Sequence, residues 1–162
     1  MNVREKPSED KQPAPTSDVL SRIMGHRLRR LHGLFAGRLG QWYRRIGLNI
    51  TPVQGGILMV IDENPGLTQV AMARILRVEA PTVYQSLTPL VEDGYIERRP
   101  SSQDGRAMEL YLSAMGRTAL DTVRIAARDN EDRLLNNLTV RERNQLGELL
   151  DKALAGAEDI VD

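Results

Sequence analysis

Cysteine is absent from the 162-residue sequence, which excludes disulfides, thiolate catalysis and thiol-based redox sensing. The two histidines, His26 and His32, are six residues apart, a separation that does not suit metal ligation from one face of a helix. Aromatic residues make up 4% of the chain, and no apolar run approaches the roughly 20 residues that cross a bilayer. Because no nucleophile motif or carboxylate pair is found either, we expect no enzyme, no cofactor or metal, and no membrane partner.

The first 17 residues lack the apolar segment of a secretion signal and hold Pro7, Pro13 and Pro15 among charged residues. This composition predicts a disordered tail over residues 1–17 and a cytoplasmic protein. The formal net charge is zero, which argues against a protein that coats nucleic acid by bulk charge. The charges are unevenly placed, since residues 1–50 carry ten Lys or Arg against four acids, whereas residues 101–162 carry eight against twelve.

Helical periodicity dominates the first half of the chain. Residues 18–46 predict one long helix, because ten apolar residues fall on one broad stripe at about 100° per residue. The segment Thr51-Pro52-Val53-Gln54 is a capping box with proline at the first helical position, and it predicts a second helix. Two short helices follow, one capped by Thr68 and one closed by Gly94. The tight turn between them indicates a helix-turn-helix.

The second half begins with a predicted β-hairpin. Residues 95–99 and 108–112 resemble strands, and the polar segment SSQDGRA between them reads as the hairpin loop, or wing. Helical periodicity then returns from about residue 114 to 137. A second capping box at Thr139-Val140-Arg141-Glu142 opens a last helix that we expect to end near residue 155.

Three short motifs make this order more specific: Gly94-Tyr95-Ile96-Glu97-Arg98, Asp104-Gly105-Arg106, and Leu112-Ser113 followed by Gly116. Together they resemble the winged helix-turn-helix core of the MarR family of bacterial transcriptional regulators. The helical flanks are similar too, so the resemblance covers about residues 18–156. It implies a mainly α fold with a small β-hairpin wing, in which an obligate homodimer grips a palindromic operator in double-stranded DNA.

The resemblance also implies a domain organisation. Residues 18–50 would form an N-terminal dimerisation helix, residues 51–113 the winged helix-turn-helix core, and residues 114–162 the C-terminal dimerisation helices. We expect the dimer seam to be leucine-rich, because these helices carry more apolar residues than one small core needs. The seam residues would be Leu134, Leu135, Leu138, Leu146, Leu149, Leu150 and Leu154.

Candidate DNA-binding residues follow from the resemblance and from the helix period. Arg106 is expected to enter a minor groove while Asp104 braces the wing, and narrow minor grooves do concentrate negative potential; the alternative is a solvated arginine paired with Asp104. The other candidates are Thr68, Gln69, Arg74, Pro81, Thr82, Gln85, Ser86 and Arg98. Gln85 suits a bidentate contact with adenine. The recognition helix is the second of the two short helices, which Gly94 closes. For each of its polar residues, the alternative is a solvated surface side chain.

Two observations count against tight DNA binding. Residues 68–113 hold five arginines against six acids. Pro89 lies inside the recognition helix, where proline removes a hydrogen bond and clashes with the preceding turn, so we expect the helix to kink or end early.

The first helix carries a face of glycines, Gly25, Gly33, Gly37 and Gly40, opposite its apolar stripe. Interior glycines cost about 1 kcal/mol each relative to alanine, so we expect something to approach this backbone closely, either a partner subunit or a ligand. The remaining alternative is that the glycines arose by drift. Residues 18–46 hold seven arginines against one acid, which favours an anionic ligand. The candidate ligand-binding residues on this face are Arg22, His26, Arg29 and Arg44.

These patterns favour a ligand-responsive repressor that binds its operator as a homodimer. Its effector would be a small anionic aromatic compound, an aromatic carboxylate or its coenzyme A thioester. The alternative is a winged-helix protein-interaction module without tight DNA binding, suggested by the neutral core and by Pro89.

Overall fold

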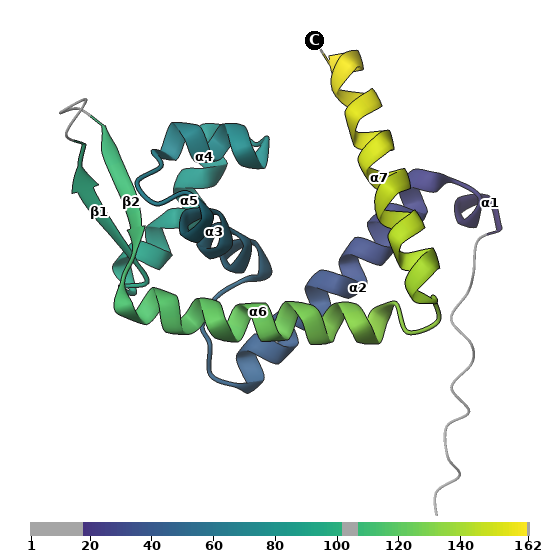
Figure 1. The fold of residues 1–162 in the computed structure, drawn as a ribbon, viewed down its shortest axis with the longest axis horizontal. Helices are drawn as coiled ribbons and strands as arrows, with labels where there is room; N and C mark the ends of the chain where they lie inside the picture. Colours follow the sequence, from purple (N-terminus) through teal and green to yellow (C-terminus); the bar gives the residue numbers. More distant parts are fainter. Residues whose placement is uncertain (1–17, 102–106, 162) are drawn as a thin grey trace, which may run out of the picture. The chain divides into compact units, whose positions relative to one another are not determined.

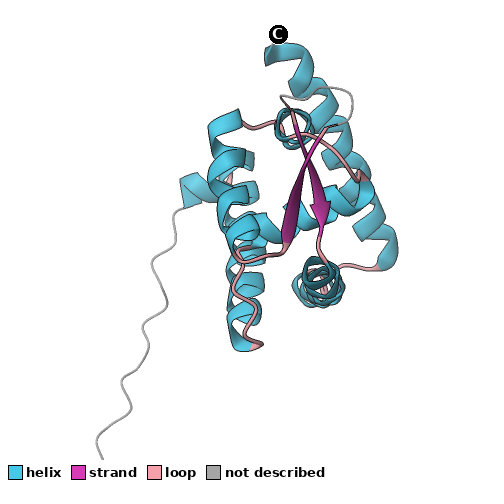
Figure 2. Ribbon diagram, turned by 90° about the vertical axis from the view of Figure 1, so that its left-hand side faces the viewer, coloured by secondary structure: helices cyan, strands magenta, loops and turns pink. Residues whose placement is uncertain are grey.

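The computed structural model describes residues 18–101 and 107–161, drawn as ribbons in Figures 1 and 2. These residues form seven helices and one two-stranded antiparallel sheet, which confirms the expected mainly helical fold with a hairpin. The chain divides into two compact units, residues 1–33 and residues 34–162. The tail predicted over residues 1–17 lies outside the described residues. No helix within the described residues combines the length and apolar character of a membrane span.

The first unit contains α1 (Asp18–Ser21) and the start of α2 (Met24–Arg45). The prediction of one uninterrupted helix over residues 18–46 is therefore wrong. The backbone ladder stops at Ser21, whose carbonyl instead accepts a hydrogen bond from Arg27 Nε at 2.7 Å. A new ladder starts at Ile23, whose carbonyl accepts from the amides of His26 and Arg27. A side chain thus satisfies a helix-end carbonyl that backbone amides leave open.

The rest of α2 belongs to the second unit and reaches its core through a face that the periodicity did not favour. Gly40 and Tyr43 are the buried residues of α2, and both belong to the glycine face. The apolar stripe is less covered, since Leu34 and Ile46 are 50% and 44% exposed. Leu39 and Trp42 of the stripe are partly buried against the core as well, so the helix packs through the edge between the two faces.

The helix-turn-helix follows α3 (Pro52–Glu63) and consists of α4 (Gln69–Leu76) and α5 (Ala80–Glu92). The capping box that opens α3 is confirmed, because Thr51 and Gln54 exchange backbone and side-chain hydrogen bonds. Thr68 caps α4 by accepting from the amide of Ala71. Arg77 ends α4 in the left-handed conformation, with φ of 52°, which makes the tight turn into α5.

Pro89 does not end the recognition helix. Helix α5 continues to Glu92, and Asp93 donates its amide to the Pro89 carbonyl at 2.8 Å. The expectation of an early end is therefore wrong. Proline removes one helical hydrogen bond, from its own nitrogen to the carbonyl four residues before it, and the backbone after it can still form helical bonds.

The hairpin pairs β1 (Ile96–Pro100) with β2 (Met108–Leu112), in a register that places Ile96 opposite Leu112. Figure 2 shows the two strands in magenta, twisted across one another. The segment before α4 joins the sheet edge, because Leu110 donates its amide to the Leu67 carbonyl at 3.0 Å. The hairpin is thus attached to the start of the helix-turn-helix.

Two long helices complete the chain, α6 (Ala114–Leu134) and α7 (Val140–Val161). Figure 1 shows α6 leading away from the base of the hairpin to the turn before α7. The predicted capping box at the start of α7 is confirmed by the bonds between Thr139 and Glu142. The Thr139 amide donates a hydrogen bond to the Glu142 carboxylate, as does the Thr139 hydroxyl, and these bonds lower the pKa of that carboxyl. Helix α7 runs to Val161, six residues past the predicted end at residue 155.

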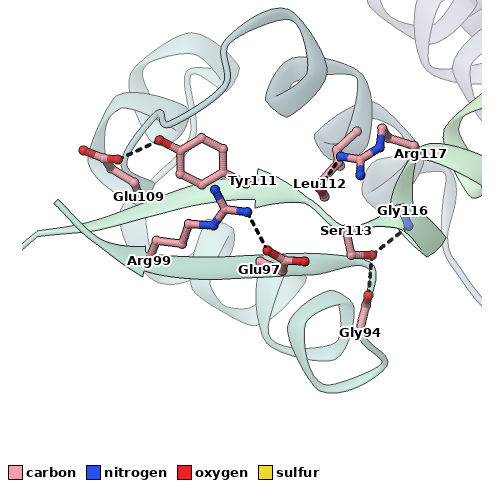
Figure 3. A network of polar contacts seen from close by, with 9 residues as sticks. All are labelled: Gly94, Glu97, Arg99, Glu109, Tyr111, Leu112, Ser113, Gly116 and Arg117. Atoms are coloured by element: carbon pink, nitrogen blue, oxygen red, sulfur yellow. Dashed lines mark hydrogen bonds and ion pairs between the residues drawn. The ribbon is translucent and has the colours of Figure 1, made fainter. Parts of the chain in front are cut away.

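Three short contacts join α5, the hairpin and α6, and Figure 3 shows part of this joint. Gly94 ends the recognition helix with φ of 78°, a conformation that favours glycine. The Ser113 hydroxyl donates to the Gly94 carbonyl at 2.6 Å and accepts from the Gly116 amide at 2.9 Å. A side chain at Gly116 would collide with the carbonyl of Tyr95. The third sequence motif, Leu112-Ser113 with Gly116, is therefore explained by packing: Ser113 forms the two hydrogen bonds, and only glycine fits at position 116.

Substitution of Gly116 tests this joint. We expect Gly116→Ala to lower the free energy of unfolding by about 3 kcal/mol, because its Cβ would press on backbone rather than on a movable side chain. Gly56→Ala is the matched control, since Gly56 lies inside α3 with open space around its Cα. That change should leave stability equal or raise it by up to about 1 kcal/mol. Denaturant unfolding at fixed protein concentration measures both, and equal stabilities would contradict the joint.

Candidate nucleic-acid interface

Helix α5 has one buried face and one exposed face. Val83, Leu87 and Leu90 are at most 1% exposed, and they recur at the spacing of an amphipathic helix. The predicted groove residues Pro81, Thr82 and Gln85 are all exposed. The structure therefore brings these three together on the first two turns of α5, held from behind by apolar anchors.

The next two polar positions of α5 are partly engaged within the protein. Ser86 is half-buried, and its carbonyl accepts from Gln54 Nε2 at 3.3 Å. Thr88 donates its hydroxyl to the Tyr84 carbonyl at 2.9 Å. Ser86 thus lies at the margin of the exposed face and contributes less to it than Thr82 and Gln85.

Gln54 is a functional residue that the sequence revealed only in part. Its capping role was predicted, but its side chain is also 7% exposed and reaches across to α5. A buried amide with both ends bonded fixes the distance between the elements it joins. Gln54 therefore ties the start of α3 to the recognition helix.

The start of α4 supplies further candidate contacts. Thr68 and Gln69 are half-buried at its first residues, and Arg74 is exposed further along the helix. Thr68 pairs with Glu109 through an isolated β-bridge, which brings the helix start beside the hairpin. The amides at a helix start can bind a phosphate, and Arg74 adds an exposed cation.

One face of the hairpin is turned toward α5 and carries Arg98. Asp104 and Arg106 lie outside the described residues. Arg98, another predicted contact, is half-buried, and its guanidinium carbon lies 5.9 Å from the centre of the Tyr84 ring. Tyr84 is 52% exposed on α5 and was not among the predicted residues. A helical wheel could have found it, because it lies next to the inward Val83.

The opposite face of the hairpin carries charges that are paired with one another, as Figure 3 shows. Arg99 contacts Glu97 at 2.8 Å and lies over the Tyr111 ring at 4.5 Å. Hydrogen bonds from Ser101 and then Tyr111 lower the pKa of the Glu109 carboxyl. This pairing keeps two of the acids of the segment away from the exposed face of α5.

The predicted ligand residues fall in different units. Arg22, His26 and Arg29 belong to the first unit, whereas Arg44 belongs to the second. Among the described residues, nothing lies within 4 Å of a Cβ built on Gly25, Gly33 or Gly37. Gly40 differs, because its Cβ would meet the Pro52 ring at 3.7 Å and the Arg44 guanidinium at 3.6 Å. These are ordinary van der Waals distances, so a Cβ would fit at Gly40 as well.

A cavity of about 210 Å³ lies between α2 and α6, within the second unit. Its polar lining is cationic, with Arg38, Arg45 and Arg133 joined by Gln41, Asp129 and Asn130, and Trp42 and Ala126 are apolar. Asp129 pairs with Arg133 at 2.8 Å. Asn130 is 7% exposed and donates to the Phe35 carbonyl at 3.1 Å, which fixes α6 against α2. None of the predicted ligand residues lines this cavity.

Comparison with known proteins agrees with this geometry. A family model described as MarR family matches residues 48–107. A protein of Thauera aromatica, named for transcriptional regulation of the hcr operon, is 31% identical over 134 residues. That match covers 74% of this chain and 81% of the relative.

Among the solved structures similar to this chain are two that contain DNA. The transcriptional repressor CouR bound to a 23-mer duplex is 26% identical with a TM-score of 0.78, covering 88% of this chain and 99% of that one. A point mutant of MarR from E. coli, complexed with operator DNA, is 26% identical with a TM-score of 0.76. It covers 85% of this chain and 99% of that one.

Proposed function

This chain belongs to the MarR family of transcriptional regulators, and we propose that it binds an operator in double-stranded DNA as a homodimeric, ligand-responsive repressor in the cytoplasm. As a member of this family it is a transcriptional regulator and no enzyme. The observation that carries the DNA-binding proposal is the exposed face of α5 beside the hairpin. Three exposed residues, Pro81, Thr82 and Gln85, stand on a rigid apolar support, as reading a major groove requires.

The contacts divide by what they recognise. Gln85 is the candidate base reader, since its amide can bond two positions of adenine. Thr68, Gln69 and Arg74 at α4 are placed to contact phosphates, which orient a protein on the duplex without reading sequence. Arg106 on the wing would enter the adjacent minor groove, with Asp104 bracing it.

Arg106 provides the first test of DNA binding. We expect Arg106→Ala to weaken operator binding by about 1 to 3 kcal/mol, because one cation leaves a groove of concentrated negative potential. The probe is the duplex that the wild-type chain enriches from a randomised pool, and gel shifts at moderate salt give the affinities. Arg128→Ala is the control, an exposed arginine on α6, and it should bind like the wild type. If Arg106→Ala left the affinity unchanged, Arg106 would be a solvated arginine that makes no contact with DNA.

The homodimer is proposed from uncovered apolar surface. None of the described side chains of α7 is buried, and Leu149 and Leu154 are 56% and 61% exposed. Leu146 and Leu150 share this stripe and are half-buried. A long helix left without a cover has an apolar face that a second copy of the same helix can bury. A two-fold axis would then place the two α5 helices about 34 Å apart, one turn of DNA.

The dimer is tested by charge on this stripe. We expect the wild-type chain to sediment as a dimer at micromolar concentration, and the double change Leu149→Glu with Leu154→Glu to yield monomers, because charges would be buried at the seam. Lys152→Glu, an exposed position on the same helix, should leave the dimer intact. A stable wild-type monomer at that concentration would refute the proposal.

The effector is proposed to be an anionic aromatic compound, an aromatic carboxylate or its coenzyme A thioester. Arg38 and Arg45 line the cavity between α2 and α6 and make no ion pair among the described residues, so they are available to a carboxylate. Arginine binds carboxylates with two charge-assisted bonds, and Trp42 offers a ring for stacking. The alternative site is the glycine face with Arg22, His26, Arg29 and Arg44.

The regulatory step is a population shift. Asn130 and Trp42 place the cavity beside the helices that connect the DNA-binding core to the proposed dimer seam. A ligand there releases DNA only if it binds the DNA-incompetent spacing of the two α5 helices more tightly than the competent one.

Trp42 is the single tryptophan of the chain, so its fluorescence reports on the cavity directly. We expect benzoate or benzoyl-coenzyme A to quench it, and Arg38→Ala to raise the dissociation constant about tenfold by removing a carboxylate partner. Arg29→Ala is the matched variant on the glycine face and should bind as the wild type does. If Arg29→Ala weakened ligand binding and Arg38→Ala did not, the site would lie on the glycine face. If neither compound quenched the fluorescence or released DNA, the proposed class of effector would be refuted.

A further inference from the structure

Tyr84 places an aromatic ring on the exposed side of α5. It follows the buried Val83 by one residue, so its side chain leaves the helix about 100° away from the core direction. The residue is 52% exposed, and the neighbouring Thr82 and Gln85 are exposed as well. A ring left in water gains free energy from any apolar group that covers it.

Arg98 approaches this ring from the hairpin. The alternation of β1 places Arg98 on the same side of the strand as the buried Ile96, and its guanidinium carbon lies 5.9 Å from the centre of the Tyr84 ring. That distance is within the range of a cation–π contact. Its Nη2 is buried and has no hydrogen-bond partner among the described residues. The Tyr84 ring is thus the one partner found for the Arg98 guanidinium among the described residues.

The arrangement differs from the second cation–π contact of the hairpin. Arg99 lies over Tyr111 on the opposite face, where Glu97 also binds its guanidinium at 2.8 Å. Tyr111 in turn donates its hydroxyl to Glu109. Within the described part of the chain, no carboxylate binds the buried Nη2 of Arg98 in this way. The Arg98 and Tyr84 pair thus joins the wing to the recognition helix, whereas the Arg99 and Tyr111 pair lies within the wing.

We propose that Tyr84 is a specificity-determining residue whose ring covers the 5-methyl group of a thymine in the major groove, and that Arg98 is the positioning residue that holds the ring. Thymine alone among the four bases presents a methyl group there, and apolar side chains recognise it. A ring restrained on one side by a cation offers its remaining apolar surface to the base. This inference rests on the proposed function, because it requires α5 to lie in a major groove.

The test removes the methyl group from the DNA. The full chain first enriches a duplex from a randomised pool, and each thymine of that duplex is then replaced singly by deoxyuridine. We expect one such replacement per half-site to raise the dissociation constant about fourfold, the effect of one buried methyl group. Tyr84→Phe should keep this sensitivity because it keeps the ring. Tyr84→Ala and Tyr84→Gln should lose it and should accept other bases at that position.

Arg98→Gln and Arg99→Gln form the matched pair for the positioning role. Arg98→Gln should reduce the deoxyuridine effect to below about twofold, since the ring is no longer held, while Arg99→Gln should retain the full effect of about fourfold. Continued preference for the other operator positions reports that each variant is folded.

The outcomes separate this inference from the function beneath it. If the wild-type chain enriches no sequence, the proposed function fails and this inference fails with it. If enrichment occurs but Tyr84→Ala and Tyr84→Gln keep the deoxyuridine sensitivity, only the role of Tyr84 is contradicted. Loss of sensitivity in Tyr84→Phe would assign the contact to the hydroxyl and overturn the methyl contact. Equal effects of Arg98→Gln and Arg99→Gln would remove the positioning role.

Discussion

The contact between Ser113 and the two glycines beside it is the constraint on which the rest of the DNA-binding core depends. Its hydroxyl bonds the Gly94 carbonyl and the Gly116 amide, and its own amide bonds the Tyr95 carbonyl at 3.0 Å. The end of α5, the root of the hairpin and the start of α6 therefore meet at one point. A recognition helix and a wing can address one DNA site together only if the angle between them is fixed, and this joint fixes it.

Three polar contacts extend that rigidity through the second unit. Gln54 ties α3 to α5, Asp62 of α3 pairs with Arg124 of α6 at 2.7 Å, and Asn130 of α6 bonds the backbone of α2. Each spans elements that are far apart in the sequence, and we propose that a displacement of α6 would reach α3 and α5 through them. A ligand between α2 and α6 would act on this chain of contacts, which is why the cavity is the proposed point of control.

The starts and ends of the helices were predicted well because each depends on only a few neighbouring residues. The capping boxes at Thr51 and Thr139 and the left-handed Gly94 required no tertiary information. Long-range choices were missed for the converse reason. The helical wheel could not tell that Tyr43 is the most deeply buried side chain of α2, or that Arg98 reaches Tyr84. The cavity unites arginines from α2 and α6, and at the break before α2 the Arg27 side chain bonds the Ser21 carbonyl.

The central claim is that this chain reads DNA through α5 and the hairpin, although its net charge is zero. The most direct measurement is the affinity for the enriched duplex as a function of salt concentration, with a scrambled duplex alongside. A DNA-binding regulator should show log affinity falling linearly with log salt, by about 0.9 for each phosphate contacted, and should prefer the enriched duplex throughout. An affinity that does not change with salt and does not distinguish the two duplexes would contradict the claim and favour a protein-interaction module.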